Sequence, residues 1–561
     1  MPREVITLQV GQAGNQIGRR FWEQALEEHC QPTEDKDANE GGIVYTESMS
    51  SFFHHHDEEH DEYQLGSRKT TNCRHSSIVK RGRLKARAVL VDMEEGPVAE
   101  TLRGPLGPLF DSHQYLTDVS GAGNNFAHGH YAYGAQYGDN VMEAVRGAAE
   151  MCDSLQSFFL MHSLGGGTGS GLGTYILGLL EDEFPNVHRF TTTVFPSEDD
   201  DVVTSPYNSM LALQQLTAHA DCVLPVENQC LMDLNSQSSS SAVAGVKIVQ
   251  PRQQRSSMHQ LLSPPSPPAA APLAPARGRQ GRYRPVSAGA AAAAAAAAAT
   301  SAVVAADVTG PTLAMRRECG FDGMNDIVAR VLLDLTASMR FGGDLNVDLN
   351  EITTNLVPFP RLHYLMTSLS LYPSAISSSP HIGNHEWAPL GGSSAAHAAA
   401  SLHLRTICSA VFSRPNQLLR SDPRRGTVLA SALLFRGRGL SLADITENVK
   451  KIQKDIRMVS WNPDGFKIGL CGTPSSSSFP SSSSSSASVL SLSNNSCVAT
   501  TFERMALRFD RLYRRKAMVH HYAEYMDASL MEEAREDLCQ VIDGYRALEA
   551  GRVTKTKWKT K

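Results

Sequence analysis

The stretch that most constrains this chain is the glycine-rich run SLGGGTGSG at residues 163–171. The segment before it, LQSFFLMH at 155–162, predicts a short buried strand, and residues 172–180 have helical spacing. Glycines let a backbone approach a phosphate closely, and the free N–H groups and dipole of a helix start favour negative charge. The run therefore predicts an anion-binding turn between a strand and a helix, with a flexible hinge as the simpler alternative.

The run matches neither of the two commonest phosphate-binding motifs. A Walker loop needs Lys and then Ser or Thr after its last glycine, and none follows here. The dinucleotide spacing GxGxxG fails at every glycine of the run. The sequence predicts phosphate binding of another kind.

Further strand and turn segments indicate the same kind of site. VITLQV at 5–10 leads into the turn GQAGNQIG, and ARAVLV at 86–91 ends in Asp92 and Glu94. Carboxylates at the carboxyl end of a parallel strand lie in the ligand crevice and suit a hydrated magnesium on phosphate. A helix N-cap with a solvated acid is the alternative. A third turn, GAGNN, follows at 121–125. These units predict an α/β fold with a parallel sheet.

Composition excludes several classes of function. The 561 residues carry a net charge of -6, which favours neither a nucleic-acid nor a membrane-surface partner. No run of about 18 apolar residues occurs, and the N-terminus indicates a strand instead of a signal peptide. The 10 cysteines form no CxxC pair, which suits a reducing compartment. We expect a cytosolic α/β protein.

Several segments predict no packed structure. Residues 31–80 are polar and loop-like, and their histidine cluster at 54–60 favours a solvated insert over a zinc site. Inserts at 236–310, 372–402 and 475–494 are rich in Ser, Ala or Pro, and the first is expected to be disordered. Genuine expansions and errors of the gene model both remain open for all three.

The C-terminal part shows helical periodicity. A single apolar face within 502–526 would be formed by Phe502, Met505, Phe509, Leu512, Val519 and Met526. The opposite face is rich in arginine, which usually marks a solvated surface.

Seven motifs in this order resemble the tubulin family: GQAGNQIG, VDMEEG, GAGNNFAHGHY, GGGTGSG, SPYNSML, RFGGDLNVDLNE and NLVPFPRLHYL. The chain is most similar to the epsilon branch in segments such as FWEQALEEH and RLYRRKAMVHHY. The resemblance implies a Rossmann-like parallel-sheet GTPase domain at 1–235 and a central helix within 311–345. It also implies an α/β intermediate domain at 346–474 and a C-terminal helical hairpin at 495–550. The chain departs from α- and β-tubulins at 551–561, where its tail is basic and theirs is acidic.

The resemblance also implies GTP and Mg²⁺ as ligands. Phosphate contacts would come from Gln12, Ala13, Asn124, Ser163, Gly167, Thr168 and Gly169. The metal would be held by Glu94, most directly, and by Asp92. The guanine edge would be read by Asn228 and Asn325, with Phe321 stacked on the base where the family has tyrosine. Ser205 stands where α- and β-tubulins carry Glu near the ribose, which leaves the sugar contacts open.

The loop NVDLNE at 346–351 carries the implied catalytic residues. By resemblance to α-tubulin, Glu351 would orient water on the nucleotide of the next subunit, and Asp348 would support the loop or polarise that water. An ordinary exposed residue beside a helix start is the alternative.

Two functional classes stay open. One is a GTPase that acts on head-to-tail assembly with other tubulins, and the other is a GTP-stabilised structural adaptor. The epsilon-like segments imply a place at centrioles or basal bodies, among their proteins.

Overall fold

The computed structural model describes residues 3–29, 42–45, 47–55, 77–80, 84–197, 200, 202–244, 321–370, 404–475 and 487–551. The insert expected at 372–402, the basic tail beyond residue 551 and most of the histidine cluster lie outside the described residues. Within those ranges, no helix has the length and apolar character needed to cross a membrane.

The first sheet has six strands, and all of them are parallel, as the sequence predicts for the sheet. Its order is β10 (Cys222–Glu227), β9 (His188–Phe195), β8 (Leu155–Ser163), β1 (Glu4–Val10), β6 (Ala88–Asp92) and β7 (Tyr115–Thr117). From β1 the chain adds β6 and β7 on one side, and β8, β9 and β10 on the other. The strand order therefore reverses between β1 and β8, and ligands of open α/β sheets bind at such a switch point.

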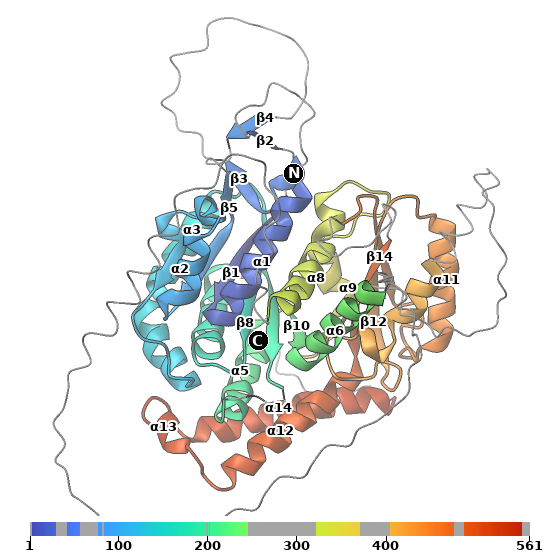
Figure 1. Ribbon diagram of the computed structural model, residues 1–561. Helices are drawn as coiled ribbons and strands as arrows, with labels where there is room; N and C mark the ends of the chain where they lie inside the picture. The colour runs from blue at the N-terminus through green and yellow to red at the C-terminus, as the bar shows by residue number, and fades with distance from the viewer. Residues whose placement is uncertain are drawn as a thin grey trace, which may run out of the picture. The chain divides into compact units, whose positions relative to one another are not determined.

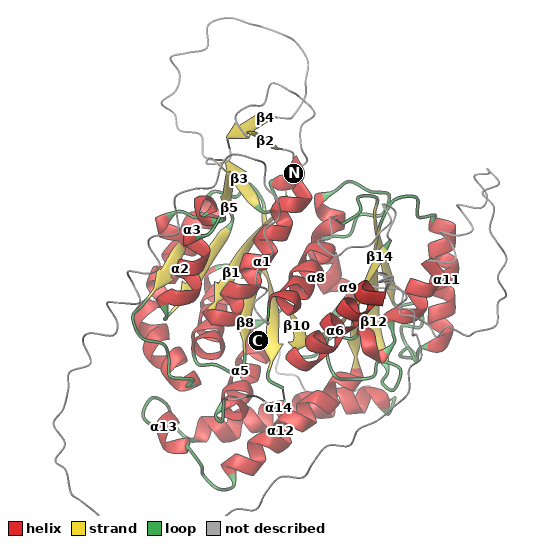
Figure 2. Ribbon diagram, in the orientation of Figure 1, coloured by secondary structure: helices red, strands yellow, loops and turns green. Residues whose placement is uncertain are grey.

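Helices cover both faces of this sheet (Figures 1 and 2). Residues of β1 alternate between the faces, so that Ile6, Leu8 and Val10 pack in one apolar cluster and Val5 packs in the other. The first cluster includes α3 (Gly134–Glu150), α4 (Gly173–Glu183) and α5 (Ser205–His219). The second includes α1 (Gly11–His29), α2 (Glu95–Arg103) and α8 (Asp322–Arg340), with α1 and α8 side by side (Figure 1).

A second, mixed sheet follows the central helix α8. Its order is β11 (Leu365–Leu369), β14 (Ser488–Asn495), β12 (Val428–Arg436) and β13 (Phe466–Cys471), with α9 (Leu349–Leu356) and α11 (Leu442–Asp455) beside it. The expected Ser-rich linker at 475–494 is wrong at its end, because β14 lies inside this sheet. Val489, Leu490 and Leu492 are buried there, and the small serines between them fit a strand buried on both faces.

Three other sequence expectations need correction. The region 31–80 is not all loop, since β2 (Gly42–Tyr45) pairs with β4 (Ser77–Lys80) and β3 (Phe53–His55) pairs with β5 (Leu84–Ala86). The insert does not begin at 236, because α6 (Asn228–Ala244) continues to residue 244.

The third correction concerns the single helical face at 502–526. The helix breaks after α12 (Ala499–Tyr513), where Lys516 and Met518 have positive φ angles of 51° and 58°. The chain then forms α13 (Val519–Ala523) and α14 (Ser529–Glu549). Both α12 and α14 pack against α5 (Figure 1).

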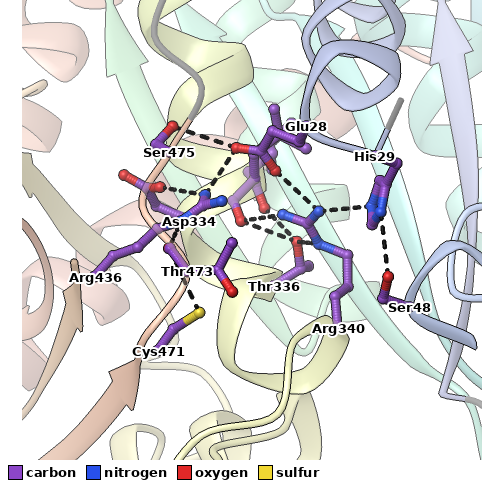
Figure 3. A network of polar contacts seen from close by, with 12 residues as sticks. Glu28, His29, Ser48, Asp334, Thr336, Arg340, Arg436, Cys471, Thr473 and Ser475 are labelled. Atoms are coloured by element: carbon purple, nitrogen blue, oxygen red, sulfur yellow. Dashed lines mark hydrogen bonds and ion pairs between the residues drawn. The ribbon is translucent and has the colours of Figure 1, made fainter. Parts of the chain in front are cut away.

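A buried ionic cluster joins helices α1 and α8 to strand β12 of the second sheet (Figure 3). We use this name for Glu28 of α1, Asp334 and Arg340 of α8, and Arg436 of β12. Glu28 lies 2.9 Å from the Arg340 guanidinium and 2.8 Å from that of Arg436, which also pairs with Asp334 at 2.9 Å. All four side chains are 3% exposed or less.

Candidate nucleotide-binding site

Two predicted phosphate turns meet at the switch point. The first follows β1 and carries Gln12 and Ala13 at the start of α1, and the second follows β8 from Ser163. Gly11 has a φ of 74°, and a Cβ on it would lie 3.0 Å from the backbone N of Gly169. Only glycine fits this contact without strain, which brings the two turns together as a shared cradle.

The turn at 121–125 completes the cradle. Asn124 adopts a left-handed φ of 53°, so its backbone bends sharply at this point. A Cβ on Gly121 would strike the carboxylate of Glu94, and one on Gly167 would lie 2.7 Å from the backbone N of Asn125. The turn at 121–125 therefore packs between Glu94, which follows β6, and the glycine run.

The glycine run is anchored, which argues against a hinge. Residues Thr168–Leu172 form a helical turn that continues into α4, and the buried side chain of His162 contacts the run. His162 Nδ1 lies 2.9 Å from Gly169 O, and its Nε2 lies 3.1 Å from the Thr193 hydroxyl. Burial lowers the pKa of His162 to about 4, so the ring stays neutral near pH 7.

Asn208 in α5 fastens two of the turns together, and the sequence analysis gave it no role. Its side-chain amide donates to Asn124 O at 2.9 Å and to Gly165 O at 2.8 Å. Its carbonyl oxygen accepts from the Phe126 N–H at 2.9 Å and from the Tyr522 hydroxyl at 2.5 Å. Both donors and both acceptor positions of the amide are thus used. In the sequence, Asn208 is one residue of the motif SPYNSML, and this signal is too weak to assign it a role by itself.

We predict that Asn208→Asp weakens GTP binding. The aspartate cannot donate to two buried carbonyl oxygens and would oppose them with negative charge, at a cost of about 1–3 kcal/mol. The change is isosteric, so packing is retained. Titration with GTP should show a roughly 5- to 150-fold rise in Kd, whereas Asn140→Asp on the exposed face of α3 should leave the Kd unchanged. Equal Kd values for the two variants would contradict the role of Asn208.

The carboxylates at the end of β6 fit a divalent cation. Asp92 is buried, and within the described part of the chain its Oδ2 has no hydrogen-bond partner. Burial raises the pKa of Asp92 to about 6, and the nearby charge of Glu94 adds to this shift. Glu94 is exposed at the N-cap position of α2, but its side chain makes no capping bond. A cation would offset these charges. Among the described residues no three His, Cys, Asp or Glu side chains gather as a metal site, so most ligands would be water and phosphate oxygens.

The predicted base contacts lie on two neighbouring helices. Asn228 is the first residue of α6, and Asn325 lies in the first turn of α8. The helices are in contact, since a Cβ on Gly323 would meet the side chain of Asn235. Phe321, at the N-cap of α8, is 56% exposed and available for stacking. The roles of these residues stay predictions.

A carboxylate that the sequence motifs do not single out lies near Ser205, where the predicted sugar contacts stay open. Ser205 is buried, and among the described residues its hydroxyl has no hydrogen-bond partner. Asp200 Oδ2 and Ser205 Oγ lie 3.1 Å and 3.5 Å from the position of a Cβ on Gly165. Asp200 therefore places a carboxylate near the hydroxyl of Ser205, which stands where α- and β-tubulins have Glu.

The predicted catalytic loop lies at the opposite edge of the sheet. Asp348 is the N-cap of α9, and its carboxylate accepts from the Glu351 N–H at 2.8 Å and lies 3.8 Å from the Arg3 guanidinium. Thr353 of the same helix lies 3.6 Å from the sulfur of Cys222. Arg3 precedes β1 and Cys222 begins β10, so α9 lies where the strands start. The phosphate turns lie where the strands end.

Comparison with known protein families identifies the class of protein that has this arrangement. The Tubulin/FtsZ family GTPase domain matches residues 4–236, and the Tubulin C-terminal domain matches residues 360–506. The chain belongs to the tubulin family, whose members are GTP-binding proteins of the microtubule cytoskeleton.

Individual relatives refine this result. The tubulin epsilon chains of Mus musculus and Homo sapiens are each 40% identical to this chain, over 97% of it and 96% of their own length. The tubulin alpha-1 chain of Saccharomyces cerevisiae is 30% identical over 97% of both chains. The resemblance to the family and to its epsilon branch is confirmed.

Proposed function

We propose that this protein binds GTP with Mg²⁺ in the cradle and hydrolyses it only when a second subunit docks head to tail. The observation that carries this proposal is that the phosphate turns and the start of α9 lie at opposite edges of the sheet. The seven residues of strand β1 run from one edge to the other and span roughly 23 Å. Glu351 of one subunit therefore cannot reach the nucleotide of the same subunit.

The exposure of Glu351 supports the same proposal. Its side chain is 44% exposed on the edge away from the cradle, where a carboxylate can meet another molecule. Phosphoryl transfer needs mainly a positioned nucleophile and charge stabilisation, so a carboxylate that orients water completes the site. Mg²⁺ held at Glu94 and Asp92 would neutralise charge on the phosphates. Asp348, whose carboxylate caps α9, then supports the loop.

Phosphate release at increasing protein concentration tests this function. Dilute subunits should be nearly inactive, and release per subunit should rise with the assembled fraction measured by sedimentation. The same assay should include other tubulins, the proposed head-to-tail partners. Equal rates in dilute and assembled samples would contradict the proposal. Assembly with retained GTP and no release would favour the structural adaptor.

Guanine selectivity gives a second prediction. Asparagine can pair with both donors and acceptors of the guanine edge, so Asn228→Ala should leave buried polar groups unpaired and cost about 1–3 kcal/mol of GTP affinity. The purified protein should retain GTP in preference to ATP, as nucleotide released on denaturation and separated by chromatography would show. Retention of ATP in preference to GTP would refute guanine binding.

We also propose a place at centrioles or basal bodies, in forming or keeping their microtubules. The support is the 40% identity to tubulin epsilon chains over almost the whole chain. A tagged copy that spreads along cytoplasmic microtubules and is absent from centrioles would count against this place.

A further inference from the structure

A lysine of the second sheet holds the carboxylate of Glu351. Lys467 Nζ lies 2.8 Å from Glu351 Oε2, and the two side chains are 31% and 44% exposed. Lys467 is the second residue of β13, whereas Glu351 lies in the first turn of α9. The pair therefore joins two elements that are distant in the sequence and presents both charges at the surface.

Both ends of this pair rest on fixed backbone. The start of α9 is held by the Asp348 cap on the Glu351 N–H. Strand β13 pairs in parallel with β12, with Lys467 opposite Ala432, and the Leu470 N–H donates to Leu345 O at 2.9 Å. Rigid backbone at both ends keeps the two charges close to each other, so Lys467 is placed to direct the Glu351 carboxylate.

The charge of Lys467 also matters for the proposed reaction. A lone carboxylate that approaches the triphosphate of another subunit meets repulsion between like charges. An ammonium at 2.8 Å offsets this charge and leaves the second carboxylate oxygen available to accept a hydrogen bond from water. Asp348 cannot accept this hydrogen bond from water, because its two carboxylate oxygens face the Glu351 N–H and Arg3.

We infer that Lys467 is a positioning residue for hydrolysis in the adjoining subunit, which holds and neutralises the Glu351 carboxylate. This inference rests on the proposed function. It adds a residue of the second sheet to a site whose other residues lie in the phosphate turns and at the start of α9.

The test compares Lys467→Met, Lys467→Arg and Glu351→Ala for phosphate release per assembled subunit at saturating GTP. Misplacing a catalytic group can cost about 100-fold, so Lys467→Met should lower the rate by about 10- to 100-fold. Lys467→Arg should restore most of it. GTP affinity of the single subunit and the thermal midpoint should stay unchanged. Lys451→Met is the matched control, because Lys451 forms an exposed ion pair with Glu447 on α11.

The outcomes separate this inference from the function beneath it. If Glu351→Ala keeps the full rate, the proposed function fails. If Glu351→Ala abolishes release while Lys467→Met matches Lys451→Met, only the role of Lys467 fails. The double variant Glu351→Ala/Lys467→Met should be no slower than Glu351→Ala alone, since the lysine acts through the carboxylate. A further loss in the double variant would also overturn the inference.

Discussion

Glu351→Ala is expected to lower GTP turnover in assembled protein by about 100- to 10,000-fold, the range of a lost positioned acid–base group. GTP binding should be intact, because the phosphate turns lie at the other edge of the sheet. Phosphate release per assembled subunit and nucleotide titration measure the two quantities. The control is Glu447→Ala, which removes an exposed carboxylate of α11 and should keep the full rate.

Mixed assemblies test whether the carboxylate acts on a neighbour. Subunits loaded with GTP labelled at the γ-phosphate are added in trace amount to an excess of unlabelled subunits. Labelled wild-type protein in excess Glu351→Ala should keep its label, because its neighbours lack the carboxylate. Labelled Glu351→Ala in excess wild type should lose it. The reverse pattern would mean that Glu351 serves its own nucleotide and would refute the head-to-tail site.

Arg340→Met is expected to lower the free energy of unfolding by about 3–5 kcal/mol, the largest effect on stability that we predict. The change leaves Glu28 buried with one guanidinium removed and an uncompensated charge between the two layers (Figure 3). Arg340 also donates to the Thr336 hydroxyl and to Leu333 O, and these partners would lose a donor. Denaturant unfolding followed by circular dichroism measures the loss.

The matched control is Arg146→Met, which breaks an exposed ion pair with Glu183 and should cost less than about 1 kcal/mol. A double variant of Glu28→Gln and Arg340→Met should lose less than the sum of the single changes, because each single change strands the other partner. Equal losses for Arg340→Met and Arg146→Met would contradict the role of the cluster.

The cluster also predicts the sign of the pH dependence. Burial works to raise the pKa of Glu28, but Arg340 and Arg436 outweigh it and hold this pKa at about 2, below the ordinary value of 4.5. The unfolded chain therefore binds the proton more readily. The stabilisation is present above pH 4.5 and is lost as the pH falls toward 2, in total about 3 kcal/mol. Arg340→Met should flatten this acid loss.

The phosphate cradle could be predicted from the sequence because each of its turns depends on residues that are close together in the chain. A turn that brings backbone N–H groups to an anion needs glycines between a strand and a helix, and residues 163–171 satisfy this within nine positions. The strands around it are also local, since their apolar runs bury on both faces of a parallel sheet. Parallel order then places Asp92 and the glycine turns at one edge, so most of the site follows from short segments.

Strand β14 shows where local information ends. Residues 488–495 are rich in serine and asparagine, and composition alone predicts a linker. Their neighbours β11 and β12 supply the backbone partners, and buried positions on both faces accept small side chains. The break after α12 has the same origin, because contacts such as that of the Tyr207 hydroxyl with Ala517 O fix the chain where helical periodicity would continue it.

The sequence by itself determined the class of fold, the family, the glycine turns and the carboxylates at the strand ends, because each depends on residue types within one turn or strand. The tertiary structure alone decided which distant groups meet. It brought Asn208 between two turns, buried Glu28 between two arginines, paired Lys467 with Glu351, and set that pair at the edge opposite the cradle. Hydrogen bonds and ion pairs act over a few ångströms, so no pattern along the chain specifies them until packing has brought their partners together.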